Sequence, residues 1–93
     1  MSAAVIRYQT KPEAADENQL LIEKVFAELA SAAPADLTYA SFRLADGVTF
    51  VHVVDGEGLA DLAAFQDFQR DLSGRFDGDL VREEATRIGS YSA

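Results

Sequence analysis

The pair Asp46-Gly47 constrains the fold of this chain more than any other feature, because it separates two stretches with the composition of β-strands. Residues 37–44 (LTYASFRL) and 48–54 (VTFVHVV) contain many β-branched and aromatic side chains. An Asp-Gly pair between two such stretches predicts a β-hairpin with a two-residue turn, since both turn positions need residues that tolerate positive φ. We therefore expect a hairpin in the middle of the chain.

The two-residue turn also fixes which residues face each other across the hairpin. It places Arg43 opposite Phe50, and Ser41 opposite His52. Because side chains alternate between the faces of a sheet, the hairpin has two different faces. The uniformly apolar face is expected to contact helices: Ala40, Phe42, Leu44, Val51 and Val53. The mixed polar and apolar face is expected to remain free of helices: Tyr39, Ser41, Arg43, Phe50, His52 and Val54.

Two helices and two further strands are predicted around the hairpin. Apolar side chains at helical spacing indicate each helix, and alternation indicates each strand. Residues 77–79 (Asp-Gly-Asp) predict a turn, and Gly89 suggests a bulge or a close backbone approach in the last strand. The predicted elements are a strand at 3–10, a helix at 14–33, a helix at 59–76 and a strand at 80–91.

The element order β-α-β-β-α-β predicts an α+β, ferredoxin-like fold in one domain spanning residues 1–93. Right-handed crossovers place both helices on one face of a four-stranded antiparallel sheet with strand order 4-1-3-2. The uncovered face would expose apolar side chains, which predicts a homodimer formed through this helix-free face. A monomeric ferredoxin-like regulatory domain is the alternative, and it would need a more polar free face.

Composition excludes several classes of partner. The formal net charge of −8 argues against nucleic acid and anionic membranes, which bind Lys and Arg. The chain has no cysteine, one histidine and no apolar stretch of membrane-spanning length, so we expect neither disulfides nor a metal site. The N-terminus lacks the pattern of a secretory signal, and we expect a cytoplasmic protein.

Several segments resemble the dimeric α+β barrel superfamily, in particular small antibiotic-biosynthesis-monooxygenase-like proteins of an uncharacterised subgroup. The similar segments are KPEAADENQLLIEKVFAEL, TYASFRLADGVTFVHVVDGEG, LAAFQDFQRDL and VREEATRIGSY. The resemblance implies a dimeric barrel whose members include cofactor-independent oxygenases of phenols, haem-degrading enzymes and proteins without a known reaction. The chain has no tryptophan, and its one histidine is in the hairpin rather than on the second helix, so we expect no haem or other cofactor.

His52 is the candidate catalytic residue, because an imidazole with a pKa near neutrality suits a general base that removes a phenolic proton. Its alternative role is a structural hydrogen bond between two sheets. The candidate substrate-binding residues are Arg7, Tyr39, Ser41 and Arg43. The arginines could instead pair with carboxylates, in particular Glu83 or Glu84, and the tyrosines could serve in packing.

Two functions remain open from the sequence. The first is a small dimeric barrel protein that binds a small ligand or serves in assembly, since no catalytic motif is present. The second is a cofactor-independent monooxygenase-like enzyme acting on a phenolic aromatic substrate, with His52 as the base. A cavity that contains His52 and an arginine would favour the enzyme.

Overall fold

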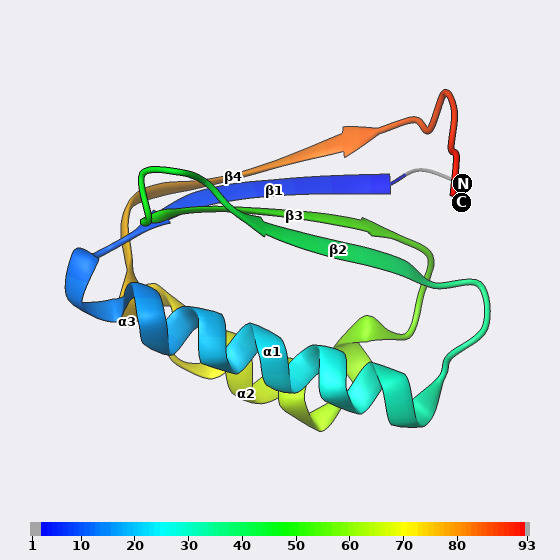
Figure 1. The fold of residues 1–93 in the computed structure, drawn as a ribbon, viewed down its shortest axis with the longest axis horizontal. Helices are drawn as coiled ribbons and strands as arrows, with labels where there is room; N and C mark the ends of the chain where they lie inside the picture. The colour runs from blue at the N-terminus through cyan, green and yellow to red at the C-terminus, as the bar shows by residue number, and fades with distance from the viewer. Residues whose placement is uncertain (1–2, 93) are drawn as a thin grey trace.

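The computed structural model describes residues 3–92 and consists of a four-stranded antiparallel sheet with its helices on one side (Figure 1). The sheet order β2-β3-β1-β4 confirms the predicted order, counted from the other edge. The strands are β1 (Ala3–Thr10), β2 (Thr38–Arg43), β3 (Thr49–Asp55) and β4 (Phe76–Ala85). The helices are α1 (Ala15–Ala32), α2 (Ala63–Arg70) and α3 (Leu72–Arg75), with short 3-10 helices η1 (Pro12–Ala14) and η2 (Leu59–Asp61).

Helix α1 follows from strong helix formers and from signals at both ends. Alanine, leucine and glutamate dominate its sequence, and Asp16 and Glu17 lie in its first turn, where the helix dipole favours negative charge. Ala33 ends the helix in a left-handed conformation with φ 45°, and its N–H donates to the carbonyl of Leu29. Pro34 follows and cannot continue the helix.

Within residues 3–92, no helix is both long and apolar enough to cross a bilayer.

The hairpin has the predicted register, but its turn differs. Arg43 pairs with Phe50, and Ser41 pairs with His52. Of the Asp-Gly pair only Gly47 has positive φ, at 79°. Asp46 instead uses its carboxylate, which accepts the backbone N–H groups of Val48 and Thr49 at 2.9 Å each and also the hydroxyl of Thr49. The Asp46 carboxylate therefore satisfies backbone N–H groups that would bond to the opposite strand in a two-residue turn. This makes the longer loop of the structure stable.

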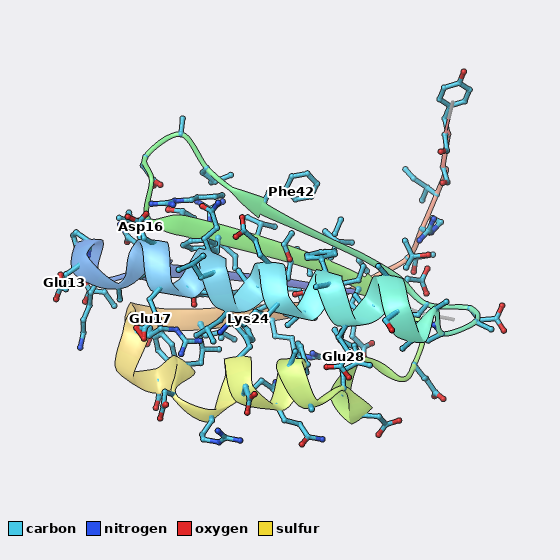
Figure 2. The ribbon with its side chains drawn as sticks, turned by 60° about the horizontal axis from the view of Figure 1, so that its bottom comes forward. Glu13, Asp16, Glu17, Lys24, Glu28 and Phe42 are labelled. Carbon is cyan, nitrogen blue, oxygen red and sulfur yellow. The ribbon has the colours of Figure 1, made fainter. Side chains whose placement is uncertain are left out.

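The prediction of which hairpin face contacts the helices was wrong. Tyr39 stacks on Phe26 of α1, and His52 contacts Phe68 of α2, so the mixed face is the covered one. Phe42 projects from the opposite side and is 54% exposed (Figure 2). The mixed face can be buried because its polar atoms bond to one another, which removes the desolvation cost on which the prediction relied.

The C-terminal third differs from the sequence prediction in three places. The predicted second helix breaks at Asp71, whose φ of −116° and ψ of 20° separate α2 from α3. Residues 77–79 lie within β4 rather than in a turn, and Gly78 adopts φ 86° where the pairing with β1 shifts register. The strand ends at Ala85, so Gly89 lies beyond it. The bulge next to Gly78 accommodates the extra residues of β4 at this register shift. The strand therefore begins at Phe76, earlier than the start at residue 80 predicted from the sequence.

A close backbone contact at Gly56 gives a prediction about stability. Gly56 and Gly58 have nearly equal φ values, 110° and 108°, but a Cβ on Gly56 would lie 2.1 Å from the carbonyl oxygen of Asp36. A Cβ on Gly58 would meet nothing within 4 Å. Gly58→Ala is expected to cost about 1–3 kcal/mol from backbone strain alone. Gly56→Ala should cost clearly more, as measured by urea unfolding, and equal losses would contradict the contact with Asp36.

Candidate functional site

His52 is the centre of a buried hydrogen-bond network beneath the helices. It lies in β3, is 3% exposed, and its ring is stacked against both Tyr8 and Tyr39. The Nε2 atom lies 2.8 Å from the hydroxyl of Tyr8, in β1. The Nδ1 atom lies 2.7 Å from the hydroxyl of Tyr39 and 2.8 Å from that of Ser41, both in β2. The two strands that flank β3 therefore hold the imidazole by both of its nitrogens.

The network continues from Tyr8 into the helices. The Asn18 Nδ2 atom of α1 donates to the Tyr8 hydroxyl at 2.9 Å, and the Asn18 Oδ1 atom accepts from Arg75 Nε at 3.0 Å. Arg75, at the end of α3, is 4% exposed, and its guanidinium lies 5.2 Å from the ring centre of Phe68. It also donates to the carbonyl of Phe68. Arg75 points inward after the break between α2 and α3, so α3 completes the network.

Burial sets the proton affinities of the network. Desolvation lowers the pKa of His52 from 6.5 to about 4, so the ring is neutral near pH 7. Burial likewise raises the pKa of Tyr8 to about 12, opposed by the hydrogen bond from Asn18. The pKa of Tyr39 is also raised by burial, and a hydrogen bond with Ser41 opposes this. In the free protein, His52 therefore differs from the near-neutral base considered from the sequence.

The lowered pKa of His52 predicts a pH-dependent stability. Below pH 6.5 the unfolded chain takes up a proton that the folded chain, with its pKa of about 4, does not accept. The contribution is therefore complete above pH 6.5 and is lost as the pH falls toward 4. Between pH 7.5 and pH 5 the free energy of unfolding should fall by about 2 kcal/mol from this group. Urea unfolding across this range measures the effect, and His52→Gln should remove most of the slope; an unchanged slope would contradict it.

A pocket of about 510 Å³ opens between the sheet and α2, and the network forms part of its wall. Tyr8, Tyr39 and His52 supply polar atoms to an otherwise mainly apolar lining. On the helix side it is bounded by Phe65 and Phe68. This volume lies in the range of small-molecule sites, which are usually apolar with a few placed polar groups.

Two further lining residues are charged, Glu57 and Arg82. Arg82, on β4, lies in the pocket wall and retains exposure to solvent. The pocket thus combines a neutral imidazole, two tyrosine hydroxyls, a guanidinium and the carboxylate of Glu57. An arginine in the wall of a mainly apolar pocket favours an anionic or strongly hydrogen-bond-accepting oxygen on a bound molecule.

The structure brings three of the predicted site residues together and separates the other two from them. His52, Tyr39 and Ser41 are in direct hydrogen-bond contact. Arg43 lies at the turn end of the hairpin, and Arg7 is exposed on the helix-free face, with its neighbour Tyr8 buried on the opposite face.

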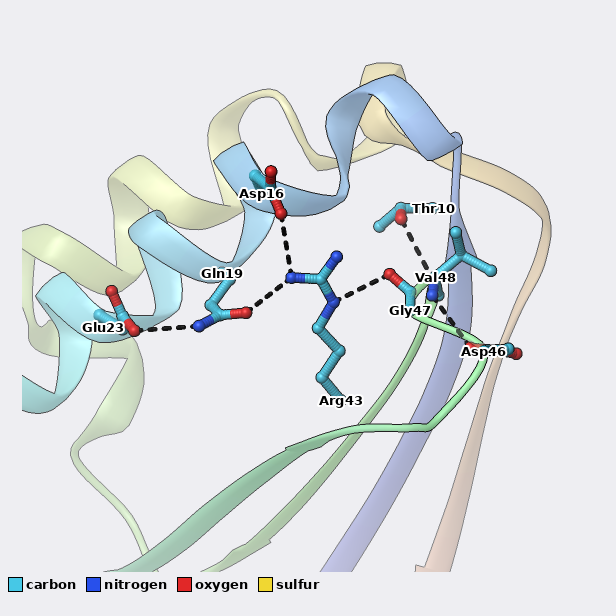
Figure 3. Close-up of polar contacts among 8 residues, drawn as sticks. All are labelled: Thr10, Asp16, Gln19, Glu23, Arg43, Asp46, Gly47 and Val48. Atoms are coloured by element: carbon cyan, nitrogen blue, oxygen red, sulfur yellow. Dashed lines mark hydrogen bonds and ion pairs between the residues drawn. The ribbon is translucent and has the colours of Figure 1, made fainter.

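Arg43 joins the hairpin to α1 (Figure 3). Its Nε donates to the carbonyl of Gly47 at 2.8 Å, and its Nη1 donates to Gln19 at 2.7 Å and to Asp16 at 3.1 Å. The guanidinium also lies 5.6 Å from the ring centre of Phe50. The carboxylate partner of Arg43 is therefore on α1, rather than on β4 as the sequence suggested.

Sequence reasoning missed Asn18, Arg75 and Arg82 as members of the site. Asn18 carried a detectable signal, because it precedes Ile22 and Val25 at helical spacing and so belongs to the apolar stripe of α1. The orientation of Arg82 depends on the register of β4, and that of Arg75 on the helix break. Neither of these is visible in the sequence pattern. Within residues 3–92, no three His, Asp or Glu side chains gather in an arrangement that could hold a metal ion.

The fold and the pocket together define a ferredoxin-like α+β protein with a ligand-sized site between its helices and its sheet. No protein-family model matches the chain, and no curated protein matches it in sequence. The structure, however, closely matches several solved structures.

A structure described as an antibiotic biosynthesis monooxygenase aligns with a TM-score of 0.73 and 18% identity, over 96% of this chain and 100% of its own. Rv0793 from Mycobacterium tuberculosis aligns with a TM-score of 0.75 and 12% identity, over 98% of each chain. SnoaB, a cofactor-independent oxygenase from Streptomyces nogalater whose N63A mutant was solved, aligns with a TM-score of 0.66 and 13% identity, over 96% of this chain and 94% of its own. The chain thus has the fold of the antibiotic-biosynthesis-monooxygenase-like proteins.

Proposed function

We propose that this protein binds a small, planar aromatic molecule with oxygen substituents in the pocket beside His52. The observation that carries the proposal is the composition of the pocket wall, in which a few polar groups are set among aromatic and aliphatic side chains. Phe65 and Phe68 offer ring faces for stacking, while Tyr39 and Arg82 offer hydrogen-bond donors. Such a surface suits a bicyclic or tricyclic phenol or ketone.

The binding proposal is tested by calorimetric titration with 1-naphthol. Ala60 lines the pocket and is exposed, so Ala60→Trp should fill part of the site and weaken binding at least tenfold. Ala27→Trp is the matched control, because Ala27 is an exposed alanine of α1 that does not line the pocket. Equal affinities for the two variants would place the binding elsewhere, and the proposal would be wrong.

A second candidate function is oxygenation of the bound phenol by dioxygen without a cofactor. It is favoured by the presence of Arg82 and His52 in one pocket, and the SnoaB structure shares the fold. A guanidinium beside a bound phenol lowers the pKa of the phenol, so the phenol releases its proton to solvent, and the phenolate gives an electron to dioxygen more readily than the phenol does. The phenoxyl radical and superoxide then combine in a new carbon–oxygen bond, and the peroxide takes up a proton and loses water to leave a carbonyl group. In this proposal His52 takes part as a hydrogen-bonded neutral imidazole in the pocket wall.

Oxygen consumption with an anthrone-like phenol tests the second candidate. Wild-type protein should consume dioxygen faster than buffer does, and both Arg82→Ala and His52→Ala should reduce the rate. No turnover by the wild type, or an unchanged rate in His52→Ala, would exclude catalysis through this histidine. Binding of 1-naphthol without turnover would leave the binding function standing by itself.

We also propose a homodimer formed through the helix-free face of the sheet. The side chains on this face are those predicted to contact helices, so the interface differs from the one expected from the sequence. Phe42 and Val81 are 54% and 47% exposed there, and Ile88 beyond β4 is fully exposed. Apolar side chains grouped on one face indicate an interaction surface. A second copy with the same face would cover them by two-fold symmetry.

Phe42→Glu tests this assembly. A charge within an apolar interface should raise the dimer dissociation constant about 100-fold. Leu20→Glu is the control, since Leu20 is an exposed leucine on α1, away from the sheet face. Sedimentation should show monomers for the first variant and dimers for the second and for the wild type. A monomeric wild type at high concentration would refute the dimer.

A further inference from the structure

Each hydrogen bond in the network around His52 can be assigned a donor and an acceptor, starting at Arg75. A guanidinium has only donors, so the Asn18 atom bonded to Arg75 Nε at 3.0 Å must be the amide oxygen. This contact fixes the orientation of the Asn18 amide. Its Nδ2 therefore points to Tyr8, 2.9 Å away, and donates to the phenolic oxygen.

The Tyr8 hydroxyl is the next donor, and it donates to His52. Its oxygen already accepts from Asn18, and its second contact is His52 Nε2 at 2.8 Å. Tyr8 lines the pocket but is only 2% exposed, and among the described residues His52 Nε2 is the one acceptor within hydrogen-bond distance of its hydroxyl, so we assign the Tyr8 hydrogen to this contact. Nε2 can accept that hydrogen only when it carries no hydrogen itself. A neutral imidazole has one hydrogen, which must then be on Nδ1.

The hydrogen on Nδ1 sets the role of Tyr39. The two oxygens near Nδ1 are those of Tyr39 at 2.7 Å and Ser41 at 2.8 Å, and both must act as acceptors toward this N–H. With its oxygen accepting from the Nδ1–H group, Tyr39 has its own hydrogen left to donate, and its side chain lines the pocket.

We propose that Arg75, Asn18, Tyr8, His52 and Tyr39 form a one-way chain of donors that holds His52 as the Nδ1–H tautomer and makes the Tyr39 hydroxyl a donor to the ligand. The occupant of the pocket therefore presents an acceptor oxygen, a ketone or a phenolate, to Tyr39. The prediction that the ligand presents an acceptor oxygen rests on the proposed binding function, whereas the prediction of the His52 tautomer does not. Arg75 and Asn18 are positioning residues, since neither lines the pocket.

The tautomer can be measured directly, because His52 is the one histidine of the chain. In a tag-free, ¹⁵N-labelled protein, long-range ¹H–¹⁵N correlation at pH 7 should show a protonated Nδ1 and an unprotonated Nε2. The Nε2–H tautomer predominates for a free histidine side chain in water, so the expected spectrum differs from the default. A protonated Nε2 in the wild type would overturn the proposal.

A single-atom change should reverse the chain. In Asn18→Asp, a carboxylate accepts from both Arg75 and the Tyr8 hydroxyl, so the Tyr8 oxygen becomes free to accept. His52 should then switch to the Nε2–H tautomer, and its two ¹⁵N signals should exchange character. Gln19→Glu is the matched control, because it makes the same amide-to-acid change one position along α1, where the side chain contacts Arg43 and Glu23 instead. The control should keep the wild-type tautomer.

A merely structural role for Asn18 would leave the tautomer unchanged in both variants, and this outcome would also refute the directed chain. Should Asn18→Asp not fold, the wild-type spectrum still decides, since it reports the tautomer without any substitution.

The predicted preference for a ligand with an acceptor oxygen is tested with 1-tetralone and tetralin, which differ by one carbonyl oxygen. The wild type should bind the ketone about fivefold more tightly than the hydrocarbon, the effect of one hydrogen bond. Tyr39→Phe should remove this preference while retaining the hydrocarbon affinity. Equal affinities in the wild type would refute the acceptor preference. Failure of both compounds and of 1-naphthol to bind would refute the proposed function, and the spectrum would still decide the tautomer.

Discussion

Replacing Phe50 by alanine is expected to lower the free energy of unfolding by about 3–5 kcal/mol, the usual cost of removing a buried phenylalanine. Phe50 is 2% exposed and stacks on Tyr8, with ring centres 5.8 Å apart. The guanidinium of Arg43 covers its ring. These neighbours come from β1 and β2, two strands that cannot close around the lost volume without moving their backbones. Urea or thermal unfolding measures the loss.

Phe42→Ala is the matched control for this prediction, and the pair decides which hairpin face is covered. Phe42 is 54% exposed, so its removal should cost about 1 kcal/mol or less when the protein is dilute enough to be monomeric. Any larger loss of unfolding free energy in Phe42→Ala should depend on protein concentration. The loss of unfolding free energy in Phe50→Ala should not depend on protein concentration. A large, concentration-independent loss in Phe42→Ala with a small one in Phe50→Ala would restore the face assignment made from the sequence.

Asn18→Leu is expected to cost about 3–5 kcal/mol, although leucine has the same number and branching of side-chain heavy atoms as asparagine. Asn18 is fully buried, and its amide serves Arg75 and Tyr8 together. Leucine would leave a buried guanidinium N–H without an acceptor, and would leave the Tyr8 oxygen without a donor. An unpaired buried charge is the more expensive of the two losses. Chemical unfolding of the variant measures the cost.

A double variant tests whether the cost arises from the unpaired guanidinium. Replacing both partners by apolar groups is less costly than removing one, so Asn18→Leu with Arg75→Met should be no less stable than Asn18→Leu alone. Gln19→Leu is the control one position along α1, where the side chain is half-buried and outside the network, and it should cost about 1 kcal/mol or less. Additive losses in the double variant would mean that Asn18 acts through packing and that its bond to Arg75 contributes little.

The sequence supports the topology because topology depends on local signals. Asp46-Gly47 marks the hairpin, and alternation and helical spacing mark the other elements, so order and register could be predicted together. Of the site, His52, Tyr39 and Ser41 were identifiable because one strand pair places them side by side. Arg75 and Arg82 were not identifiable, since a helix break and a bulge set their orientation, and both depend on contacts with distant strands.

By itself, the sequence determined the β-α-β-β-α-β order, the pairing of the strands and the segregation of two kinds of side chain onto opposite faces of the hairpin. Only the tertiary structure decided which of those faces the helices cover. The reason is that polarity of single residues does not predict their burial when they can satisfy one another. His52, Tyr8 and Asn18 come from separate elements, and only their meeting makes it favourable to bury a histidine rather than a valine beneath the helices.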